Sequence, residues 1–546
     1  MADSAPPPAF TLPEPFAGWF GARGWQARPH QLALAEASLA GDSALLIAPT
    51  GGGKTLAGFL GSLIELGQGG HRSNSGIPAL HTLYISPLKA LAVDVQRNLM
   101  MPVNEMGLDI RIETRTGDTP PHVRQRQRRN PPDVLLTTPE QLALFIASDH
   151  AKDFFADLKC VIVDEIHAIA ASKRGDLLSL GLATLAHWAP QCRFLGLSAT
   201  VRDPQGLADW LDVRDNGRDV RILTADGGVS AEVDILVSRE RIPWSGHSGR
   251  FAVKEVYEAI KAATMTLVFV NTRSQAELMF QELWNVNEDG LPIALHHGSL
   301  AREQRTKVEA AMAAGKLKAV VCTSTLDPVS TGVRVDLVVQ DGRRGGRAPH
   351  PARIGRANHR MDEASRAVLV PTNRFEILEC RAAEAAVEAG EIDGEGLRTG
   401  ALDVLAQHVM GRACGDGFEL TDLYDEIVRA GPYRHLDWEA FERIVDFVAN
   451  GGYALKTYDR FHRIVRRPDG RWVARTPQDA QAHRMNVGAI VESPMLSVRM
   501  ASFVGKAGEG EQRAVRAGWA SWARWRNISF AADARQLTRG RLRSAS

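Results

Sequence analysis

Short apolar runs of β type alternate with helical stretches from about residue 44 to 370, and no other feature constrains the fold as strongly. Such alternation is typical of parallel sheets, because a parallel strand needs a crossover segment, usually a helix, to bring the chain back. The runs form two blocks, and the strands expected from them are 44–47, 83–85, 134–136, 160–163, 194–197, 267–270, 293–295, 319–321, 337–339 and 367–370. The sequence therefore predicts an α/β fold with two parallel-sheet domains that join between 213 and 250.

The chain changes character after about residue 400. Apolar residues at helical spacing predict helices over 420–430 and 436–450, and Gly451-Gly452 ends the second. Residues 461–467 and 471–473 flank an Asp-Gly turn and predict a hairpin. Helices followed by a basic hairpin indicate a winged-helix-type module of α+β structure.

The composition excludes several classes of protein. Lys+Arg 65 against Asp+Glu 64 leaves a net charge of +1, so the total charge indicates no polyanionic partner, although a local basic groove can lie within a neutral total. The five cysteines contain no Cys-x-x-Cys pair, which argues against a zinc site or a disulfide framework and fits a reducing cytoplasm. No apolar window approaches the length of a membrane span, so a cytoplasmic protein without a membrane partner is expected.

Residues 48–55, Ala-Pro-Thr-Gly-Gly-Gly-Lys-Thr, follow an expected strand and open an expected helix, which is the context of a phosphate-binding loop. Backbone N–H groups and the helix N-terminus favour phosphate oxygens, Lys54 is expected to reach the β- and γ-phosphates, and Thr55 to bind Mg²⁺. The residues expected to bind the nucleotide are Thr50, Gly51, Gly52, Gly53, Lys54 and Thr55. The alternative is a glycine-rich turn with a chance Lys-Thr, and the flanking strand and helix favour the phosphate loop.

Two adjacent carboxylates end the apolar run 160–163 and are followed by Ile166 and His167. Asp164 is expected to hold Mg²⁺ through water, and Glu165 to orient and deprotonate the attacking water. Without a nucleotide such a pair is ordinary solvated surface, but the phosphate loop upstream favours a shared site for ATP and Mg²⁺. The sequence therefore predicts ATP hydrolysis, and His167 after the acidic pair suggests that the hydrolysis is coupled to a second process.

The Asp-Glu-Ile-His run together with Gly-Lys-Thr resembles the superfamily 2 DExH-box helicases, and further segments resemble that group's motifs in the expected order. They are 86–91, 115–119, 137–140, 198–200, 268–272, 296–300, 322–325 and 353–360. Within the group, Lys173-Arg174-Gly175 and the runs 296–300 and 354–360 resemble the large helicase-related (Lhr) family, in particular its bacterial ligase-associated DEXH-box branch. The resemblance covers about residues 15 to 495.

The resemblance implies two tandem RecA-like domains and a 3′-to-5′ ATP-driven translocase on single-stranded DNA, which unwinds duplex DNA in repair. It implies that Gln31 reads adenine, with Phe20 or Trp25 packing nearby or lying in the plain core. It also implies that Arg356 and Arg360 approach the γ-phosphate as arginine fingers. A functional association with a DNA ligase and a nuclease is implied by the same resemblance alone.

The resemblance further implies which loops grip one strand, since hydroxyls and backbone amides follow phosphates without reading sequence. The residues expected to contact the strand are Ser86, Pro87, Arg115, Gly117, Thr137, Thr138, Asn271, Thr272, His297 and Thr323. The basic run 124–129 is interpreted as a solvated helix face in preference to a DNA contact. For the hairpin arginines, contact with duplex DNA and simple solvation stay open.

The sequence departs from the family's pattern between 327 and 352. Residues 328–333 stand where the family typically has Leu-Gly-Ile-Asp-Trp-Gly, and 341–352 replace an apolar, Gly- and Pro-containing stretch whose last residue, a Gln, is here Ala352. Length is kept while side-chain character is lost, as paired frameshifts would produce; divergence is the alternative. Because the family's segment links the γ-phosphate to the strand, an uncoupled ATP- and DNA-binding protein is a second hypothesis beside the DNA helicase. An RNA or RNA–DNA hybrid helicase is a third, because contacts to phosphates discriminate poorly between DNA and RNA and only 2′-OH contacts would decide.

The expected domains are 1–220, the first RecA-like domain, and 221–395, the second. A winged-helix-like domain over 396–492 and a poorly ordered tail over 493–546 follow. The segment 514–546 is rich in Arg, Ala and Trp and holds no plausible strands, so a truncated or out-of-frame end is preferred to an amphipathic tail that binds DNA or a partner.

Overall fold

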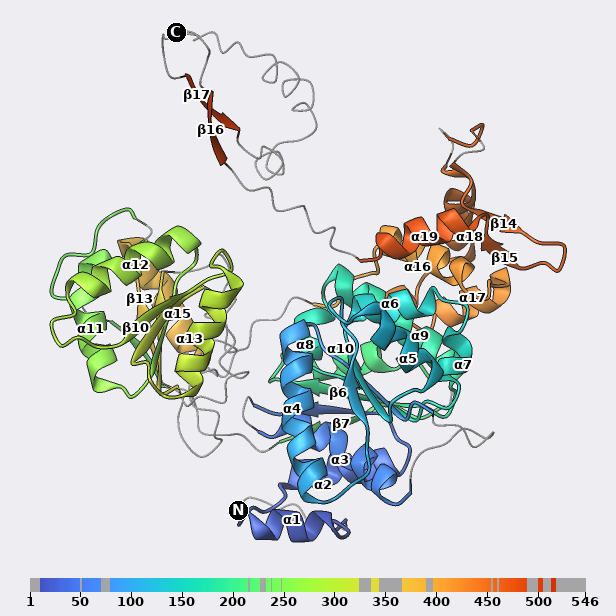
Figure 1. Cartoon of the computed structure of the whole chain (residues 1–546), viewed down its shortest axis with the longest axis horizontal. Coiled ribbons are helices and arrows are strands. Elements are labelled where there is room, and N and C mark those ends of the chain that lie inside the picture. The colour runs from blue at the N-terminus through green and yellow to red at the C-terminus, as the bar shows by residue number, and fades with distance from the viewer. Residues whose placement is uncertain are drawn as a thin grey trace. The chain divides into compact units, whose positions relative to one another are not determined.

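The structure is a computed structural model of the 546-residue chain. It describes residues 10–49, 52–69, 79–214, 217–225, 232–236, 238–246, 248–323, 335–342, 366–388, 396–452, 455–458, 461–488, 499–503 and 512–516. Within these residues the chain forms two parallel sheets, a smaller helical domain with a hairpin, and a second hairpin near the C-terminus (Figure 1).

The first sheet has seven parallel strands in the order β3-β4-β2-β5-β6-β1-β7. The strands are β1 (Ala44–Ile47), β2 (Thr82–Ile85), β3 (Ile112–Thr114), β4 (Val134–Thr137), β5 (Cys160–Val163), β6 (Arg193–Ser198) and β7 (Arg221–Thr224). The helices are α1 (Phe16–Ala22), α2 (Pro29–Leu39), α3 (Lys54–Gly67), α4 (Lys89–Glu105), α5 (Pro121–Arg129), α6 (Pro139–Ile146), α7 (Ala151–Phe155), α8 (Ile166–Ile169), α9 (Lys173–Trp188) and α10 (Pro204–Leu211).

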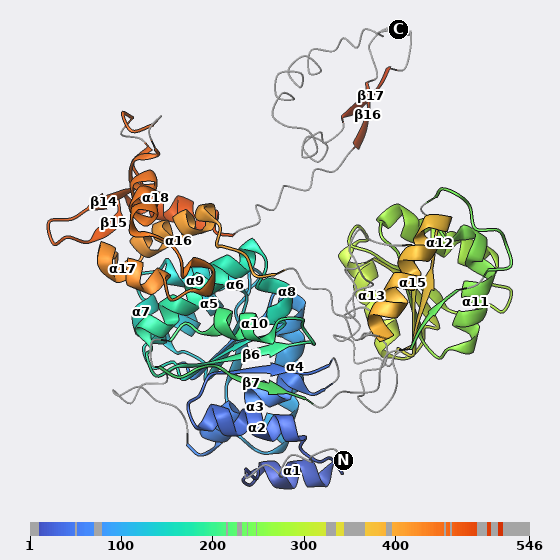
Figure 2. The ribbon, with the colours of Figure 1, turned by 180° about the vertical axis from the view of Figure 1, so that it is seen from behind.

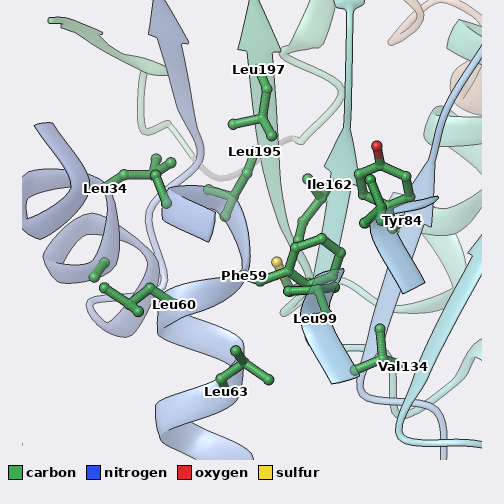
Figure 3. Packing of buried hydrophobic residues seen from close by; sticks show 14 of the residues in the cluster. Leu34, Phe59, Leu60, Leu63, Tyr84, Leu99, Val134, Ile162, Leu195 and Leu197 are labelled. Carbon is green, nitrogen blue, oxygen red and sulfur yellow. The ribbon is translucent and has the colours of Figure 1, made fainter. Parts of the chain in front are cut away.

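The core of this domain lies between the sheet and helices α2, α3 and α4 (Figure 3). Phe59 of α3 and Tyr84 of β2 stack with ring centroids 5.3 Å apart, and Leu195 and Leu197 of β6 are fully buried in the same cluster. Central strands buried on both faces read as continuous apolar runs, which is why the sequence reveals them. The packing fixes α3, and with it the loop that precedes α3, against the middle of the sheet.

The strands predicted in both blocks are confirmed, with ends that differ by a residue or two. In the described part of the two sheets, three strands were not predicted, β3, β7 and β8 (Glu232–Ile235), and each has a physical reason. β3 has only three residues, while β7 and β8 lie at sheet edges, where their side chains are mostly exposed or half-buried. An edge strand needs no continuous apolar run, so the pattern used to find strands is absent there.

The second sheet has six parallel strands in the order β10-β11-β9-β12-β13-β8. Its other strands are β9 (Thr266–Phe269), β10 (Ile293–His296), β11 (Ala319–Cys322), β12 (Leu337–Asp341) and β13 (Arg366–Val370). The helices are η1 (Arg250–Ala252), α11 (Val253–Ala262), α12 (Arg273–Asn285), α13 (Arg302–Ala313) and α15 (Arg374–Glu388). Figures 1 and 2 show α11 and α12 on one side of this sheet and α13 on the other, and separate apolar clusters fill the two faces.

The chain passes from one sheet to the other between β7 and β8. β7 pairs with β1 of the first sheet, and β8 pairs with β13 of the second. The changeover therefore lies between 224 and 232, within the predicted interval of 213 to 250 and later than the expected boundary at 220.

In its described residues the third domain contains four α-helices, a 3-10 turn and a short antiparallel hairpin. Its elements are α16 (Leu402–Cys414), α17 (Leu420–Ile427), η3 (Gly431–Tyr433), α18 (Trp438–Asn450), β14 (Ile464–Arg466), β15 (Trp472–Ala474) and α19 (Pro477–Met485). The predicted helices are present, and α18 begins at Trp438 because the Asp437 carboxylate accepts a hydrogen bond from the Ala440 N–H at 2.7 Å. Gly451, with φ of 77°, ends it as expected.

This domain is fastened to α9 of the first domain through a buried polar cluster. Glu426 accepts hydrogen bonds from the Thr184 hydroxyl at 2.5 Å and from Arg412 Nη2 at 3.1 Å, and all three side chains are buried. His408 lies 3.7 Å from the same carboxylate. Although burial opposes it, these partners hold the pKa of Glu426 down at about 2.

The C-terminal part, 488–546, is a separate unit. Its described strands β16 (Arg499–Phe503) and β17 (Gln512–Arg516) pair antiparallel. The prediction that no strand occurs from 514 onward is therefore wrong for 514–516, which belong to β17. This strand has only two apolar residues, Ala514 and Val515, between two arginines, and that is too short a run for the pattern used to predict strands. Residues 517–546 lie outside the described part of the chain. In the described part, no helix combines the length and apolar character that crossing a membrane requires.

Candidate nucleotide site and strand-contact edge

Apart from Gln31, which lies on α2, the predicted site residues of the first domain lie at or follow the carboxyl ends of its strands, which in a parallel sheet share one edge. The strand order divides them into two groups. Residues 48–55, 164–167 and 198–200 follow β1, β5 and β6, and are here called the nucleotide half. Residues 86–87, 115–117 and 137–140 follow β2, β3 and β4, and are here called the strand half. The two halves meet where β2 pairs with β5.

The loop after β1 is held tightly at its end. Gly53 is the N-cap of α3 with φ of 74°, and a Cβ there would lie 2.5 Å from Gln31 Nε2. The left-handed backbone favours glycine, and any Cβ there would displace the end of the Gln31 side chain from the loop. Lys54 is buried and its Nζ donates a 3.0 Å hydrogen bond to the Ala48 carbonyl. Thr55 is half-buried, and Thr50 and Gly51 lie outside the described residues.

Two consecutive side chains of α2 hold the carbonyls of this loop. His30 Nε2 lies 2.8 Å from the Gly52 carbonyl oxygen, and Gln31 Nε2 donates to the Gly53 carbonyl at 3.3 Å. Gln31 also accepts from the Arg28 N–H through its Oε1, which fixes the orientation of its amide. Of the two aromatics considered beside Gln31, Phe20 is buried in the core, whereas Trp25 is half exposed.

Asp164 at the end of β5 is buried and accepts two hydrogen bonds. Tyr84 of β2 donates its hydroxyl to Oδ2 at 2.5 Å, and the Glu165 N–H donates to Oδ1 at 2.8 Å. Burial, together with the neighbouring Glu165 carboxylate, raises the pKa of Asp164. Burial and the two carboxylates likewise raise the pKa of Tyr84 well above its ordinary value, so this phenol stays a donor.

Glu165 has a left-handed backbone, with φ of 50°, which is uncommon for a residue other than glycine. The turn sets its side chain beside His167, whose Nε2 lies 3.3 Å from Glu165 Oε2. The Ala199 N–H donates to His167 Nδ1 at 3.3 Å, which assigns the proton of the neutral ring to Nε2. His167 therefore connects the acidic turn with the loop after β6.

These residues fit a Mg²⁺–nucleotide. The pKa of the buried Asp164 carboxyl is raised without ligands, and a nearby cation would stabilise its charged form. In magnesium–nucleotide sites the protein usually contributes one carboxylate and one hydroxyl. Asp164 and Thr55 would supply these two groups. No cluster of three or more His, Cys, Asp or Glu side chains suited to a metal occurs in the described ranges.

The strand half is built from buried hydroxyls at strand ends. Thr137 donates its hydroxyl to the Arg115 carbonyl at 2.8 Å, and Arg115 donates its N–H to the Leu136 carbonyl at 2.8 Å. Ser86 is fully buried, with its hydroxyl 3.4 Å from the Leu88 carbonyl. Thr138 is buried as the N-cap residue of α6, while Pro87 is half-buried and Gly117 exposed.

Arg115 is a buried cation with no anionic partner in the described part of the chain. Its guanidinium carbon lies 3.6 Å from the centre of the Phe145 ring, and the side chain is 5% exposed. Its Nε and Nη1 find no hydrogen-bond partner among the residues that the structure describes. Burial, with Arg128 and Arg124 nearby, lowers the pKa of Arg115 to about 9. An anion placed here would relieve both the missing hydrogen bonds and the repulsion.

Two arginines of the basic run on α5 make contacts within the protein. Arg124 donates to the carbonyls of Thr116 and Gly117 at 3.1 and 2.7 Å, and Arg126 pairs with Glu113 at 2.6 Å. Gln127 is buried and donates to Glu113 and to the Thr114 carbonyl. These contacts hold the loop that carries Gly117.

The second domain also places its predicted residues at strand ends. Asn271 and Thr272 follow β9, His297 follows β10 and Thr323 follows β11, and these three strands are adjacent. Thr272 caps α12 through a hydrogen bond from the Gln275 N–H at 3.2 Å, and buried His297 lies 3.3 Å from Glu277. Arg356, Arg360, Ala352 and residues 328–333 lie outside the described part of the chain.

Asp341, the first residue of the altered segment 341–352, places a carboxylate in a buried position at the end of β12. It is 2% exposed, and among the described residues it accepts a hydrogen bond from the Gly249 N–H at 2.9 Å. Burial raises the pKa of its carboxyl to about 7. The family pattern predicts an apolar stretch from this position, and the buried environment explains why.

Sequence reasoning did not assign roles to His30, Tyr84, Arg124, Glu140 or Arg174, although each contacts a predicted site residue or its loop. Glu140 and Arg174 stand inside segments that resemble family motifs, and His30 adjoins Gln31, so proximity to a motif was an available signal. Tyr84 gave none, because a tyrosine inside an apolar strand reads as core.

Comparison with known proteins matches three consecutive family models. Residues 28–207 match the DEAD/DEAH box helicase model, and 252–366 match the helicase conserved C-terminal domain. Residues 385–515 match the winged helix domain of large helicase-related protein, which confirms the predicted winged-helix module.

Similar full-length proteins are longer than this chain. "Lhr helicase/probable uracil glycosylase" of Mycolicibacterium smegmatis is 32% identical over 89% of this chain and 35% of its own length. "ATP-dependent helicase Lhr-Core protein 2" of Thermococcus barophilus is 31% identical over 89% of this chain and 58% of its own length. The chain thus spans about a third to three fifths of these relatives.

Among solved structures, that of Mycobacterium smegmatis helicase Lhr bound to single-stranded DNA and AMP-PNP is similar to this chain with a TM-score of 0.75. The two are 31% identical, and the match covers 92% of this chain and 68% of the other.

Proposed function

The chain belongs to the large helicase-related (Lhr) family, and on this premise we propose that it is an ATP-dependent helicase acting on DNA. The observation that carries the proposal is the junction of the two halves of the first sheet. Tyr84 of β2 donates to Asp164, and Ser86 and Pro87 come two and three residues later in the sequence, just after the same strand. A nucleotide at one half and a nucleic-acid strand at the other would therefore act on adjoining residues.

In this proposal Glu165 orients and deprotonates the attacking water, and Lys54 neutralises phosphate charge. Mg²⁺ held with Asp164 and Thr55 would supply electrostatic stabilisation of the reacting phosphates when bound. Gln31 would read adenine, and Arg356 and Arg360 would act as arginine fingers. His167 would couple a change at Glu165 to the loop at Ala199, because it contacts both residues.

At the strand half the proposal assigns phosphate contacts to Arg115, whose buried nitrogens lack partners among the described residues, and to the loops that carry Ser86, Pro87, Gly117, Thr137 and Thr138. Asn271, Thr272, His297 and Thr323 would provide the second domain's grip. The structure of the Mycobacterium smegmatis relative holds single-stranded DNA, which supports DNA as the strand here. The 3′-to-5′ direction, duplex unwinding and a role in repair extend the same proposal.

A second candidate function is an ATP- and DNA-binding protein whose hydrolysis is not coupled to movement. Asp341 favours it, because a buried carboxylate with one hydrogen bond among the described residues interrupts a segment whose family counterpart is apolar. Such a protein would keep the nucleotide half and lose unwinding.

One experiment separates these candidates. Phosphate release from ATP is measured with and without single-stranded DNA for the wild type, Lys54→Ala and Glu165→Gln, with Arg443→Ala as an exposed control on α18. We expect stimulation by DNA in the wild type and control, and a loss of about 10²- to 10⁴-fold in both site variants.

Strand separation is then followed on duplexes with 3′ or 5′ tails of DNA or RNA. Unwinding of the 3′-tailed DNA duplex supports the helicase, and hydrolysis without unwinding of any duplex supports the uncoupled protein. Preference for RNA tails would move the proposal to an RNA substrate. Wild-type hydrolysis no higher than that of Lys54→Ala would rule out both.

A further inference from the structure

The first turn of α9, residues 173–176, contacts three parts of the chain that are far apart in sequence. The turn begins seven residues after Ile166, so it follows the acidic turn closely. Ser172 caps it, because its hydroxyl accepts from the Gly175 N–H at 3.2 Å and donates to the Ile169 carbonyl at 2.7 Å. The first contact is therefore with the segment that carries Glu165 and His167.

Gly175 makes that contact very close. A Cβ at this position would lie 2.3 Å from the Ile169 carbonyl oxygen and 2.7 Å from that of Ala170. No side chain fits against two backbone oxygens at such distances. The turn is thereby placed by the end of α8, and a shift of α8 has to move it.

Arg174 joins the two strand-contact loops. Its Nη2 donates to the Pro87 carbonyl at 2.8 Å, and its Nε donates to Glu140 Oε1 at 2.6 Å. Pro87 follows Ser86 after β2, and Glu140 lies two residues beyond Thr138 after β4. Since β2 and β4 are neighbours in the sheet, one guanidinium fixes the spacing of two adjacent loops.

The geometry suits a positioning role. Arg174 also donates from Nη2 to Glu140 Oε2 at 3.2 Å, so the planar fork engages both carboxylate oxygens. The Arg174 and Glu140 side chains are 23% and 28% exposed, so solvent reaches the pair only in part. With its donors directed at protein oxygens, this arginine differs from Arg115, whose buried nitrogens lack such partners in the described structure.

The same turn also holds the start of the third domain. Asp176 has a fully buried side chain and accepts from Arg398 Nη2 at 2.9 Å and from the Ala401 N–H at 3.1 Å. Lys173 pairs with Asp403 of α16 at 2.6 Å. One helical turn therefore contacts the acidic segment, both strand-contact loops and the winged-helix domain.

We infer that Arg174 is a positioning residue for strand binding, which sets the distance between the loops after β2 and β4 according to the state of the acidic turn. This inference rests on the proposed function, because it names how the nucleotide half acts on the strand half. Arg174 itself does not touch the strand. Lys173 and Asp176 carry the same movement to the third domain.

The test is equilibrium binding of a fluorescent single-stranded oligothymidylate, measured by anisotropy over a range of salt concentrations, without ATP hydrolysis. For Arg174→Ala we expect the Kd to rise about tenfold, equivalent to about 1.4 kcal/mol. The slope of log Kd against log salt should stay at the wild-type value, because no phosphate contact is lost. Loss of a direct phosphate contact would instead lower the slope by about 0.7 for a single strand.

Three further variants guard the result against a folding defect. Arg174→Lys keeps the charge but not the planar fork, so we expect a Kd about threefold above the wild type. Glu140→Gln keeps the shape and weakens the pair, with an effect of similar size. Arg443→Ala should bind as the wild type does, and the thermal midpoints of all variants are recorded.

The outcomes separate the inference from the proposal beneath it. A wild type that does not bind the oligonucleotide would overturn the proposed function and this inference with it. An Arg174→Ala variant that binds normally, or whose salt slope falls, would overturn only the inference. So would a lowered thermal midpoint with Kd unchanged in all three variants of the pair.

Discussion

The two halves of the first sheet's carboxyl edge are held in place by different means. In the nucleotide half the predicted residues contact one another or their own loops, as in the pairs Lys54–Ala48, Asp164–Glu165 and His167–Ala199. In the strand half the loops are held by Arg124 and Arg174, which come from helices outside the predicted contacts. The nucleotide half thus combines contacts of its own with support from His30 and Gln31 of α2 and from Tyr84 of β2. The loops of the strand half depend on arginines of α5 and α9, so their geometry can respond to those helices.

The largest effect is expected from adding a side chain at Gly53 of the nucleotide half. Gly53→Ala places a Cβ 2.5 Å from Gln31 Nε2 on a left-handed backbone, so we expect nucleotide affinity to fall about 100-fold. Binding of a fluorescent ATP analogue measures it. Gly24→Ala is the matched control, since Gly24 also has positive φ, 64°, but no atom within 4 Å of its Cβ position.

That control should bind the analogue as the wild type does. Truncating the obstruction in the double variant Gly53→Ala, Gln31→Ala should recover only part of the loss, because backbone strain persists. Equal affinities for Gly53→Ala and Gly24→Ala would show that the loop adapts, and the contrast between the halves would fail.

His167 tests whether the nucleotide half communicates outward. Removing the ring in His167→Ala breaks the contacts with Glu165 and Ala199, so stimulation of hydrolysis by DNA should fall about tenfold. The measurement is the ratio of phosphate release with and without DNA. His187→Ala, an exposed histidine at the end of α9, should keep the ratio. An unchanged ratio in His167→Ala would remove His167 from the connection.

In the strand half, Arg115→Ala should raise the Kd for single-stranded DNA about five- to tenfold and lower the salt slope by about 0.7. The reason is that a buried guanidinium, whose Nε and Nη1 lack hydrogen-bond partners among the described residues, is removed where a phosphate is proposed. Arg129→Ala, exposed at the end of α5, is the control and should change neither quantity. If Arg129→Ala has the larger effect, the basic run binds the strand and its interpretation as a solvated face is wrong.

The smallest effect is expected at Asp341, a buried carboxylate with fewer hydrogen-bond donors than Asp164 among the described residues. Among the described residues Asp341 has one donor, where Asp164 has two, and burial raises the pKa of Asp341 to about 7. A raised folded-state pKa means that the folded domain binds the proton more tightly, so this stabilisation is complete below pH 3.8 and declines as the pH rises through 7. Asp341→Asn should therefore raise the apparent Tm by about 3 °C at pH 8 and by less at pH 5.

Thermal unfolding at the two pH values checks this, with Asp234→Asn as an exposed control on β8 of the same domain. An equal change at both pH values would show that Asp341 does not titrate in this range. A destabilised Asp341→Asn at pH 8 would show that the carboxylate is needed as such.

The contrast between the halves also explains which features could be predicted. Strand-forming runs such as 160–163 and the loop at 48–55 are local patterns, because continuous burial or phosphate contact fixes residue type at short spacing. The edge strands β7 and β8 were not predictable, since exposed side chains carry no such pattern. The contacts of residues such as Arg174 depend on which loops the sheet places side by side. Local sequence patterns do not determine the strand order, so these contacts could not be predicted. Tyr84 illustrates the limit, because only the pairing of β2 with β5 gives its hydroxyl a partner.

The buried cluster of Glu426, Arg412 and Thr184 has a practical consequence for making fragments of this protein. The winged-helix domain and the first sheet share that cluster and the contacts of α9, although the whole second sheet lies between them in the sequence. A fragment ending near 220 would expose Thr184 and Asp176 to water and remove their partners. A graft that replaces 232–388 with a short linker would retain them, so in expression trials the discontinuous fragment should outlast the contiguous one.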